Sequence, residues 1–199
     1  MQNNKKEDIV LGRSKLKIFI VALVAALFTF FSTNTLAYYQ TVGKATNVVT
    51  SGNIEFKIKE MTDQGTEFPS EGVFILPGDI VSKEVSIESL CEHPFYLRVK
   101  IVYGIDSVEL SAEDCFKLNI NEEYWQLHDG WYYYTGIVNP GETTPKVFSH
   151  VEIVGSKVDN SYIGKTLTLS VDAQGVQSEN NPIKDGNTYT ALGWPVEEN

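Results

Sequence analysis

The chain has 199 residues, a formal net charge of −10 at pH 7 and 42% hydrophobic residues, which is typical of a folded globular protein. This acidic balance argues against nucleic acid as a partner, because a protein that binds phosphate backbones must supply cations in place of their counterions. The same charge disfavours binding to anionic lipid.

The first 37 residues have the three-part layout of a secretory signal peptide. A basic stretch precedes an apolar run over residues 18–31, and a short polar segment follows. The run has fourteen residues, whereas a helix that spans a bilayer needs about 20. Cleavage is therefore predicted, with no permanent membrane span afterwards, and retention as an anchor is the alternative. Small residues at Thr35 and Ala37 place the cut between Ala37 and Tyr38.

Removal of residues 1–37 takes away five basic and two acidic side chains, which leaves a mature chain with a charge of about −13. Its 162 residues are sufficient for one domain with a sizeable core. The predicted organisation is an N-terminal segment (38–52), a β-sandwich domain (53–173) and a polar C-terminal tail or loop (174–199), which Trp194 could pin to the domain.

Residues of alternating polarity dominate the mature chain. Ile54, Phe56 and Ile58 alternate with Glu55 and Lys57, as expected of a strand with one buried face. The same alternation recurs around Val81, Val85 and Ile87, along residues 95–103, at 116–120 and at 167–171. No segment has the pattern of a long amphipathic helix, so the chain is predicted to be all-β.

Turn residues separate these strands at short intervals. Asp129 and Gly130 lie between two aromatic-rich runs and predict a two-residue hairpin with a type I′ turn. Pro-Gly and Asn-Pro-Gly sequences at 77–79 and 139–141 predict further tight turns. Several short strands with such punctuation predict a jelly-roll or immunoglobulin-like antiparallel β-sandwich.

The aromatic residues Trp125, Trp131 and Tyr133 suggest a stacking platform for a ligand such as a carbohydrate. The alternative is structural, because consecutive residues of a strand point to opposite faces and some of these rings would then fill the core.

Cys91 and Cys115 are the only cysteines. Export to an oxidising exterior would allow them to form a disulfide, and the alternative is two free, buried thiols.

No catalytic motif is present in the sequence. His93, His128 and His150 are scattered, without the spacing of a helical zinc site, and no Gly-x-Ser-x-Gly elbow or phosphate-binding loop occurs. We therefore expect no metal, no cofactor and no enzymatic activity.

Several short motifs lie in order along the chain, at residues 35–39, 50–54, 76–79, 96–99, 130–134, 140–143 and 171–177. Together they resemble the exported TasA and camelysin proteins of Gram-positive bacteria, which a signal peptidase of the SipW type processes. The resemblance implies a secreted jelly-roll subunit of biofilm matrix fibres, located in the extracellular matrix or at the cell surface. Its partners would be other copies of itself or other matrix proteins.

The resemblance also implies donor-strand exchange, in which the N-terminal segment of one subunit completes a sheet of the next. Residues 38–49 are the candidate donor, with Tyr39, Val42 and Val48 among the apolar contacts. An N-terminal strand folded onto its own domain, or a disordered leader, is the alternative. Two other functions stay open: a monomeric adhesin or carbohydrate-binding module, and a camelysin-like metallopeptidase.

Overall fold

The computed structural model describes residues 39–42 and 54–195 of the chain. The predicted cleavage residues Ala37 and Tyr38, and the predicted donor residue Val48, lie outside this described part. The chain divides after Ala37, and the domain described below belongs entirely to residues 38–199.

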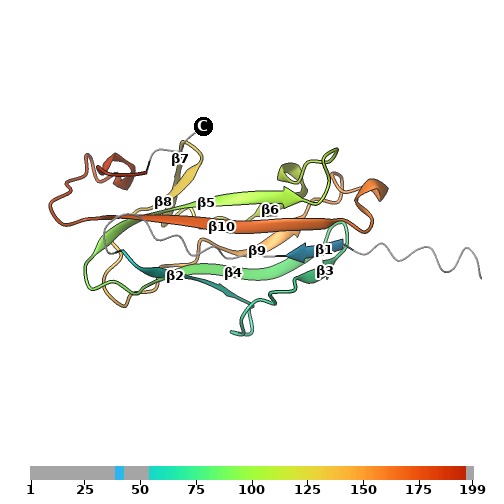
Figure 1. The fold of residues 1–199 in the computed structure, drawn as a ribbon, viewed down its shortest axis with the longest axis horizontal. Helices are drawn as coiled ribbons and strands as arrows, with labels where there is room; N and C mark the ends of the chain where they lie inside the picture. The colour runs from blue at the N-terminus through green and yellow to red at the C-terminus, as the bar shows by residue number, and fades with distance from the viewer. Residues whose placement is uncertain (1–38, 43–53, 196–199) are drawn as a thin grey trace, which may run out of the picture. The chain divides into compact units, whose positions relative to one another are not determined.

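The described residues form a sandwich of two β-sheets, so the predicted all-β fold is confirmed (Figure 1). Sheet A has the strand order β3 (Val73–Ile75), β1 (Tyr39–Val42), β10 (Thr166–Gln177), β5 (Phe95–Ile105), β8 (Trp131–Tyr134) and β7 (Trp125–His128). Sheet B has the order β2 (Phe56–Met61), β4 (Ile80–Ser89), β9 (Phe148–Ile153) and β6 (Phe116–Leu118). Neighbouring strands are antiparallel, except that β1 runs parallel to β10.

The two longest strands, β5 and β10, form the backbone of sheet A and lie side by side along the molecule (Figure 1). Their inward side chains follow the period of two that the sequence predicts: Leu97, Val99, Leu169 and Val171 are fully buried. Each such side chain contributes about 1.5–3 kcal/mol through the hydrophobic effect, so this row accounts for much of the stability of the domain.

The hairpin between β7 and β8 has the predicted turn. Asp129 and Gly130 have φ angles of 47° and 78°, both in the left-handed region that a type I′ turn requires at its two central positions. Aspartate tolerates this region better than most residues, and glycine has no side chain to clash.

The structure also contains elements that the sequence patterns do not predict. Strand β3 has only three residues, and three short 3₁₀ helices cover Glu113–Cys115, Asn160–Tyr162 and Thr188–Thr190. No helix in the described ranges is long and apolar enough to cross a bilayer.

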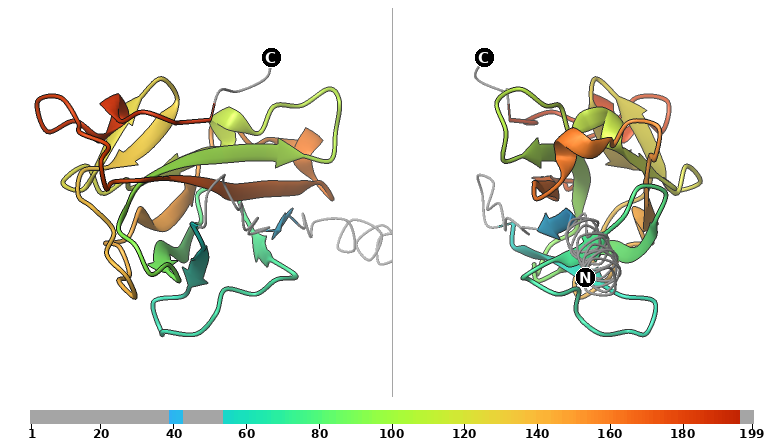
Figure 2. Two further views of the ribbon diagram at one scale, coloured as in Figure 1. Left: turned by 60° about the vertical axis from the view of Figure 1, so that its left-hand side comes forward. Right: turned by 90° about the vertical axis from the view of Figure 1, so that its right-hand side faces the viewer.

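The predicted domain boundary at residue 173 is wrong, because β10 continues to Gln177. The segment that follows, residues 178–195, is called the C-terminal strap below. It returns to the β7–β8 end of sheet A (Figure 2). The strap is thus a packed part of the domain, as the interpretation of Trp194 as a pin anticipates.

Candidate functional site

Strand β1 occupies a slot between β10 and β3. Gln40, Thr41 and Val42 pair in parallel with residues 166–168 of β10, while residues 39–41 pair with β3 in the antiparallel sense. The slot is therefore made of backbone groups on both sides. Because main-chain pairing is indifferent to which chain supplies the strand, such a slot can accept an extended segment from elsewhere.

The outer wall of the slot, β3, is held by the turn that follows it. The Leu76 N–H donates to Asp79 Oδ2 at 2.6 Å, and the Gly78 N–H donates to the Ile153 carbonyl at 2.9 Å. Gly78 has a φ of 90°, which suits glycine at this position of the predicted Pro-Gly-Asp turn. The turn thus joins the edge of sheet A to the middle of sheet B.

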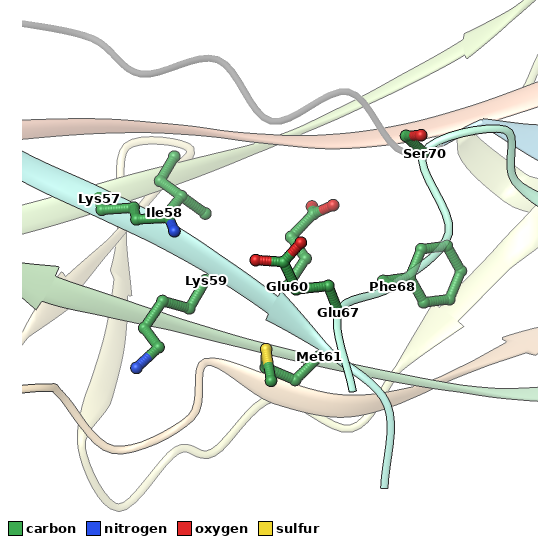
Figure 3. A pocket seen from close by; sticks show the side chains of 8 residues that line it. All are labelled: Lys57, Ile58, Lys59, Glu60, Met61, Glu67, Phe68 and Ser70. Carbon is green, nitrogen blue, oxygen red and sulfur yellow. The ribbon is translucent and has the colours of Figure 1, made fainter. Parts of the chain in front are cut away.

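The segment that leads into β3 is attached to the end of β2. The Phe68 N–H donates to the Glu60 carbonyl at 2.9 Å, and Met61 forms a β-bridge with Glu67. A hollow of about 230 Å³ lies here, and Figure 3 shows the Glu60, Glu67 and Phe68 side chains around it. These contacts anchor the segment before β3 to the end of β2.

A buried ion pair lies next to this hollow. Lys83 Nζ is 2.9 Å from Glu60 Oε1, and the ammonium also lies 4.5 Å from the centroid of the Phe68 ring. Burial lowers the pKa of Lys83 below its ordinary value, although the carboxylate of Glu60 opposes this shift. Lys83 is not among the residues that the sequence patterns single out as functional, although a lysine in the inward row of β4 between Val81 and Val85 is a detectable signal.

The three aromatic residues of the predicted platform do not share one exposed surface. The pairing of β7 with β8 places Trp125 on one face of sheet A, and Trp131 and Tyr133 on the other. All three are buried, with exposed fractions of 1%, 5% and 4%. The platform interpretation is therefore wrong, because alternation divides the rings and the strap covers those on the outer face.

Arg98 organises the outer aromatic cluster. Its guanidinium lies 4.1 Å from the Trp131 ring centroid and 4.9 Å from that of Trp194. It donates to Gln174 Oε1, to the hydroxyl of Tyr133 and to the carbonyl of Pro195. We call this group the Arg98 cluster, and it binds the end of the strap to β5, β8 and β10.

Further contacts hold the rest of the strap. The Tyr189 ring stacks on His128 at a centroid distance of 4.0 Å, and the Thr188 hydroxyl donates to the Tyr134 carbonyl at 2.8 Å. A small apolar cluster lies under the strap and consists of Tyr96, Val176, Ala191, Ile183 and Trp194.

Cys91 and Cys115 are both buried and no disulfide joins them, so the structure has the alternative of two buried thiols. The Cys91 thiol interacts with the backbone of Glu55, while the Cys115 thiol donates to the Ser111 carbonyl. Burial raises the pKa of the Cys115 thiol, which favours the unreactive protonated form.

The three histidines lie in different surroundings. His93 is exposed in a turn, His128 stacks on Tyr189, and the backbone of His150 on β9 binds Asn119 Oδ1. Among residues 54–195, no group of three or more His, Cys, Asp or Glu side chains is arranged to hold a metal ion.

The chain has no match among family models, curated proteins or solved structures. Inference about its function therefore depends on the slot and on the sequence.

Proposed function

We propose that the protein is a secreted structural subunit that assembles into extracellular matrix or biofilm fibres by donor-strand exchange. The observation that supports this is the position of β1: the first strand after the predicted cleavage site lies between β10 and β3. The strand that fills the slot is therefore the one closest to the mature N-terminus and the one that signal-peptide cleavage would release.

Departure of β1 would leave unpaired backbone groups on both sides of the slot. Residues 166–168 of β10 would lose the pairing on one edge, while 167–168 keep their pairing with β5, and residues 73–75 of β3 would lose their partner strand. Buried backbone groups without partners are costly, and the same segment of a second copy restores the lost pairing. The intact subunit then corresponds to a self-complemented state, and the fibre to a state in which each copy completes its neighbour.

Such exchange naturally gives a fibre rather than a closed dimer. The donor segment and the slot are different surfaces of the subunit, so the contact is heterologous, and heterologous contacts propagate unless the rotation between copies closes a ring. The acidic mature chain is compatible with this, since it remains soluble until the strands exchange.

The experiment compares a chain that starts at Tyr38 with one that starts at Gly52, which lacks β1. We expect electron microscopy and light scattering to show fibres or oligomers from the longer chain only. A synthetic peptide of residues 38–49 should bind the shorter chain and block its incorporation into fibres of the longer one. If both chains remain monomeric across pH, calcium and protein concentration, the proposal is wrong.

A further inference from the structure

Two charged residues occupy inward positions of sheet B where apolar residues are expected. On β4, Lys83 follows the same alternation as the buried Val85 and Ile87. On β2, Glu60 continues the row of Phe56 and Ile58. The two strands are adjacent and antiparallel, with Glu60 opposite Val85, so the two side chains meet diagonally on the inner face.

The Lys83–Glu60 ion pair is largely shielded from water and has few hydrogen-bond partners. The Lys83 side chain is 1% exposed and that of Glu60 is 11% exposed. Within the described residues, neither Lys83 Nζ nor Glu60 Oε1 has a hydrogen-bond partner apart from the 2.9 Å ion-pair contact itself. An ammonium carries more N–H donors than one carboxylate oxygen can accept, and two buried ions carry a desolvation penalty that their mutual attraction only partly offsets.

We propose that Lys83 and Glu60 form an intramolecular isopeptide bond between β4 and β2. The product is a neutral secondary amide, which removes both buried charges and leaves one N–H donor and one carbonyl acceptor to be satisfied. The contact between the amine and the carboxylate already holds the reacting groups together, and such proximity supplies a large part of the barrier reduction in reactions between fixed groups.

The reaction is a condensation that needs no oxidant and no activated donor. A proton passes from the Lys83 ammonium to the Glu60 carboxylate, which gives a neutral amine and a neutral acid. Lys83 Nζ then attacks the Glu60 carboxyl carbon, the C–N bond forms, and the C–OH bond breaks. One amine hydrogen and the hydroxyl leave as water. Burial assists the first step, because it lowers the pKa of Lys83.

The hollow beside Glu60 provides a route for the water that is formed and a second carboxylate for proton transfer. It is open to the exterior, so the water formed has a route out, and Glu67 lines the same wall (Figure 3). We assign Glu67 as the carboxylate that relays the proton from the attacking nitrogen to the departing oxygen. The buried Phe68 ring lies over the Lys83 ammonium, with its centroid 4.5 Å away, and shields it in part from solvent.

The bond would fasten the edge of sheet B. Strand β2 pairs only with β4 in the described sheet, and the chain from its end leads into β3. A covalent link from Glu60 to Lys83 closes a loop that contains β3 and the turn after it. This inference is independent of the proposed fibre assembly, since the bond forms within one chain.

The same two strands provide a matched control. Lys59 and Glu88 also form an ion pair between β2 and β4, at 3.7 Å, but their side chains are 33% and 36% exposed. The residue types and the two strands are the same, although the lysine is on β2 here and on β4 in the buried pair. The control pair differs in its greater exposure and its longer contact. Hydrated ions of this kind have no drive to condense, so no bond between Lys59 and Glu88 is expected.

The test measures the intact mass of the exported full chain after reduction and denaturation, followed by peptide mapping. We expect a mass lower by one water molecule than the sequence of the cleaved chain requires, and a branched peptide that joins Lys83 to Glu60. The Lys59 and Glu88 peptides should remain unlinked. A full mass together with separate Lys83 and Glu60 peptides overturns the proposal.

Variants extend the test to the chemistry. Lys83→Met should have the full mass that its sequence requires. Glu60→Gln should also have its full mass, or a mass lower by one ammonia molecule if the glutamine side chain reacts with Lys83. Glu67→Gln should slow the appearance of the linked form in a time course that starts when the newly made, unlinked chain first folds. Linkage at the wild-type rate in Glu67→Gln overturns the assignment of the relay.

Discussion

The Arg98 cluster gives a prediction whose magnitude follows from the contacts. Replacement of Arg98 by lysine keeps the positive charge and most of the stem, but it removes the planar fork of donors. The arginine makes four hydrogen bonds to three groups and lies over the rings of Trp131 and Trp194. A lysine ammonium cannot reach Gln174 twice while it also serves the Tyr133 hydroxyl and the strap.

We expect Arg98→Lys to lower the free energy of unfolding by about 2–3 kcal/mol, because at least one charge-assisted hydrogen bond and part of the ring stacking are lost. The penalty for a buried charge remains in both proteins and cancels. For a domain of this size, the melting temperature should fall by roughly 5–10 °C. The strap should loosen first, since the lost bond to the Pro195 carbonyl holds its end.

Urea unfolding followed by tryptophan fluorescence measures the change, and limited proteolysis within residues 178–195 reports on the strap. The matched control is Lys117→Ala, because Lys117 makes an exposed ion pair with Glu152 and its loss should change stability by less than about 0.5 kcal/mol. If Arg98→Lys is as stable as this control and its strap is no more sensitive to protease, the cluster does not hold the strap.

Three further predictions concern the slot, alkaline pH and the hairpin. Thr41→Pro should abolish fibre formation in electron micrographs, because a proline inside a strand paired on both sides removes a backbone donor, whereas Thr41→Val should assemble normally. Burial raises the pKa of Tyr103 to about 12 from 10.0, with smaller contributions from Tyr132 and Glu113. The Tyr103 hydroxyl therefore ionises in the unfolded chain first as pH rises from 10, and the stability of the folded protein falls. Tyr103→Phe should reduce this fall, measured as the change in the urea midpoint between about pH 9 and about pH 11. An unchanged fall would contradict the assignment to Tyr103. Gly130→Ala should lower the free energy of unfolding, measured with urea, by about 1 kcal/mol, because the φ angle of Gly130 is 78°. The space around the new methyl group is open, so no steric clash contributes. An unchanged free energy would rule out conformational strain at the turn.

Local patterns in the sequence predict most strands because each reports its own surroundings. The alternation along β5 and β10 marks the buried face directly, and Asp129-Gly130 specifies the hairpin through its backbone preferences. Strand β3 escapes prediction because three residues are too few to show a period, and its exposed Phe74 contradicts the expected burial pattern. The strap is predicted only in part: Trp194 indicates that its end is pinned, but its polar composition hides how few apolar residues suffice to pack the rest.

The sequence by itself determines the fold class, the hairpin turn and the acidic character of the chain, since these depend on neighbouring residues and on composition. Only the tertiary structure decides which segments meet. It places β1 between β10 and β3, divides the aromatic residues between two faces, keeps Cys91 and Cys115 out of a disulfide, and brings Lys83 to Glu60. These contacts join residues that are distant in sequence. They depend on how the two sheets pack together, which no local pattern encodes.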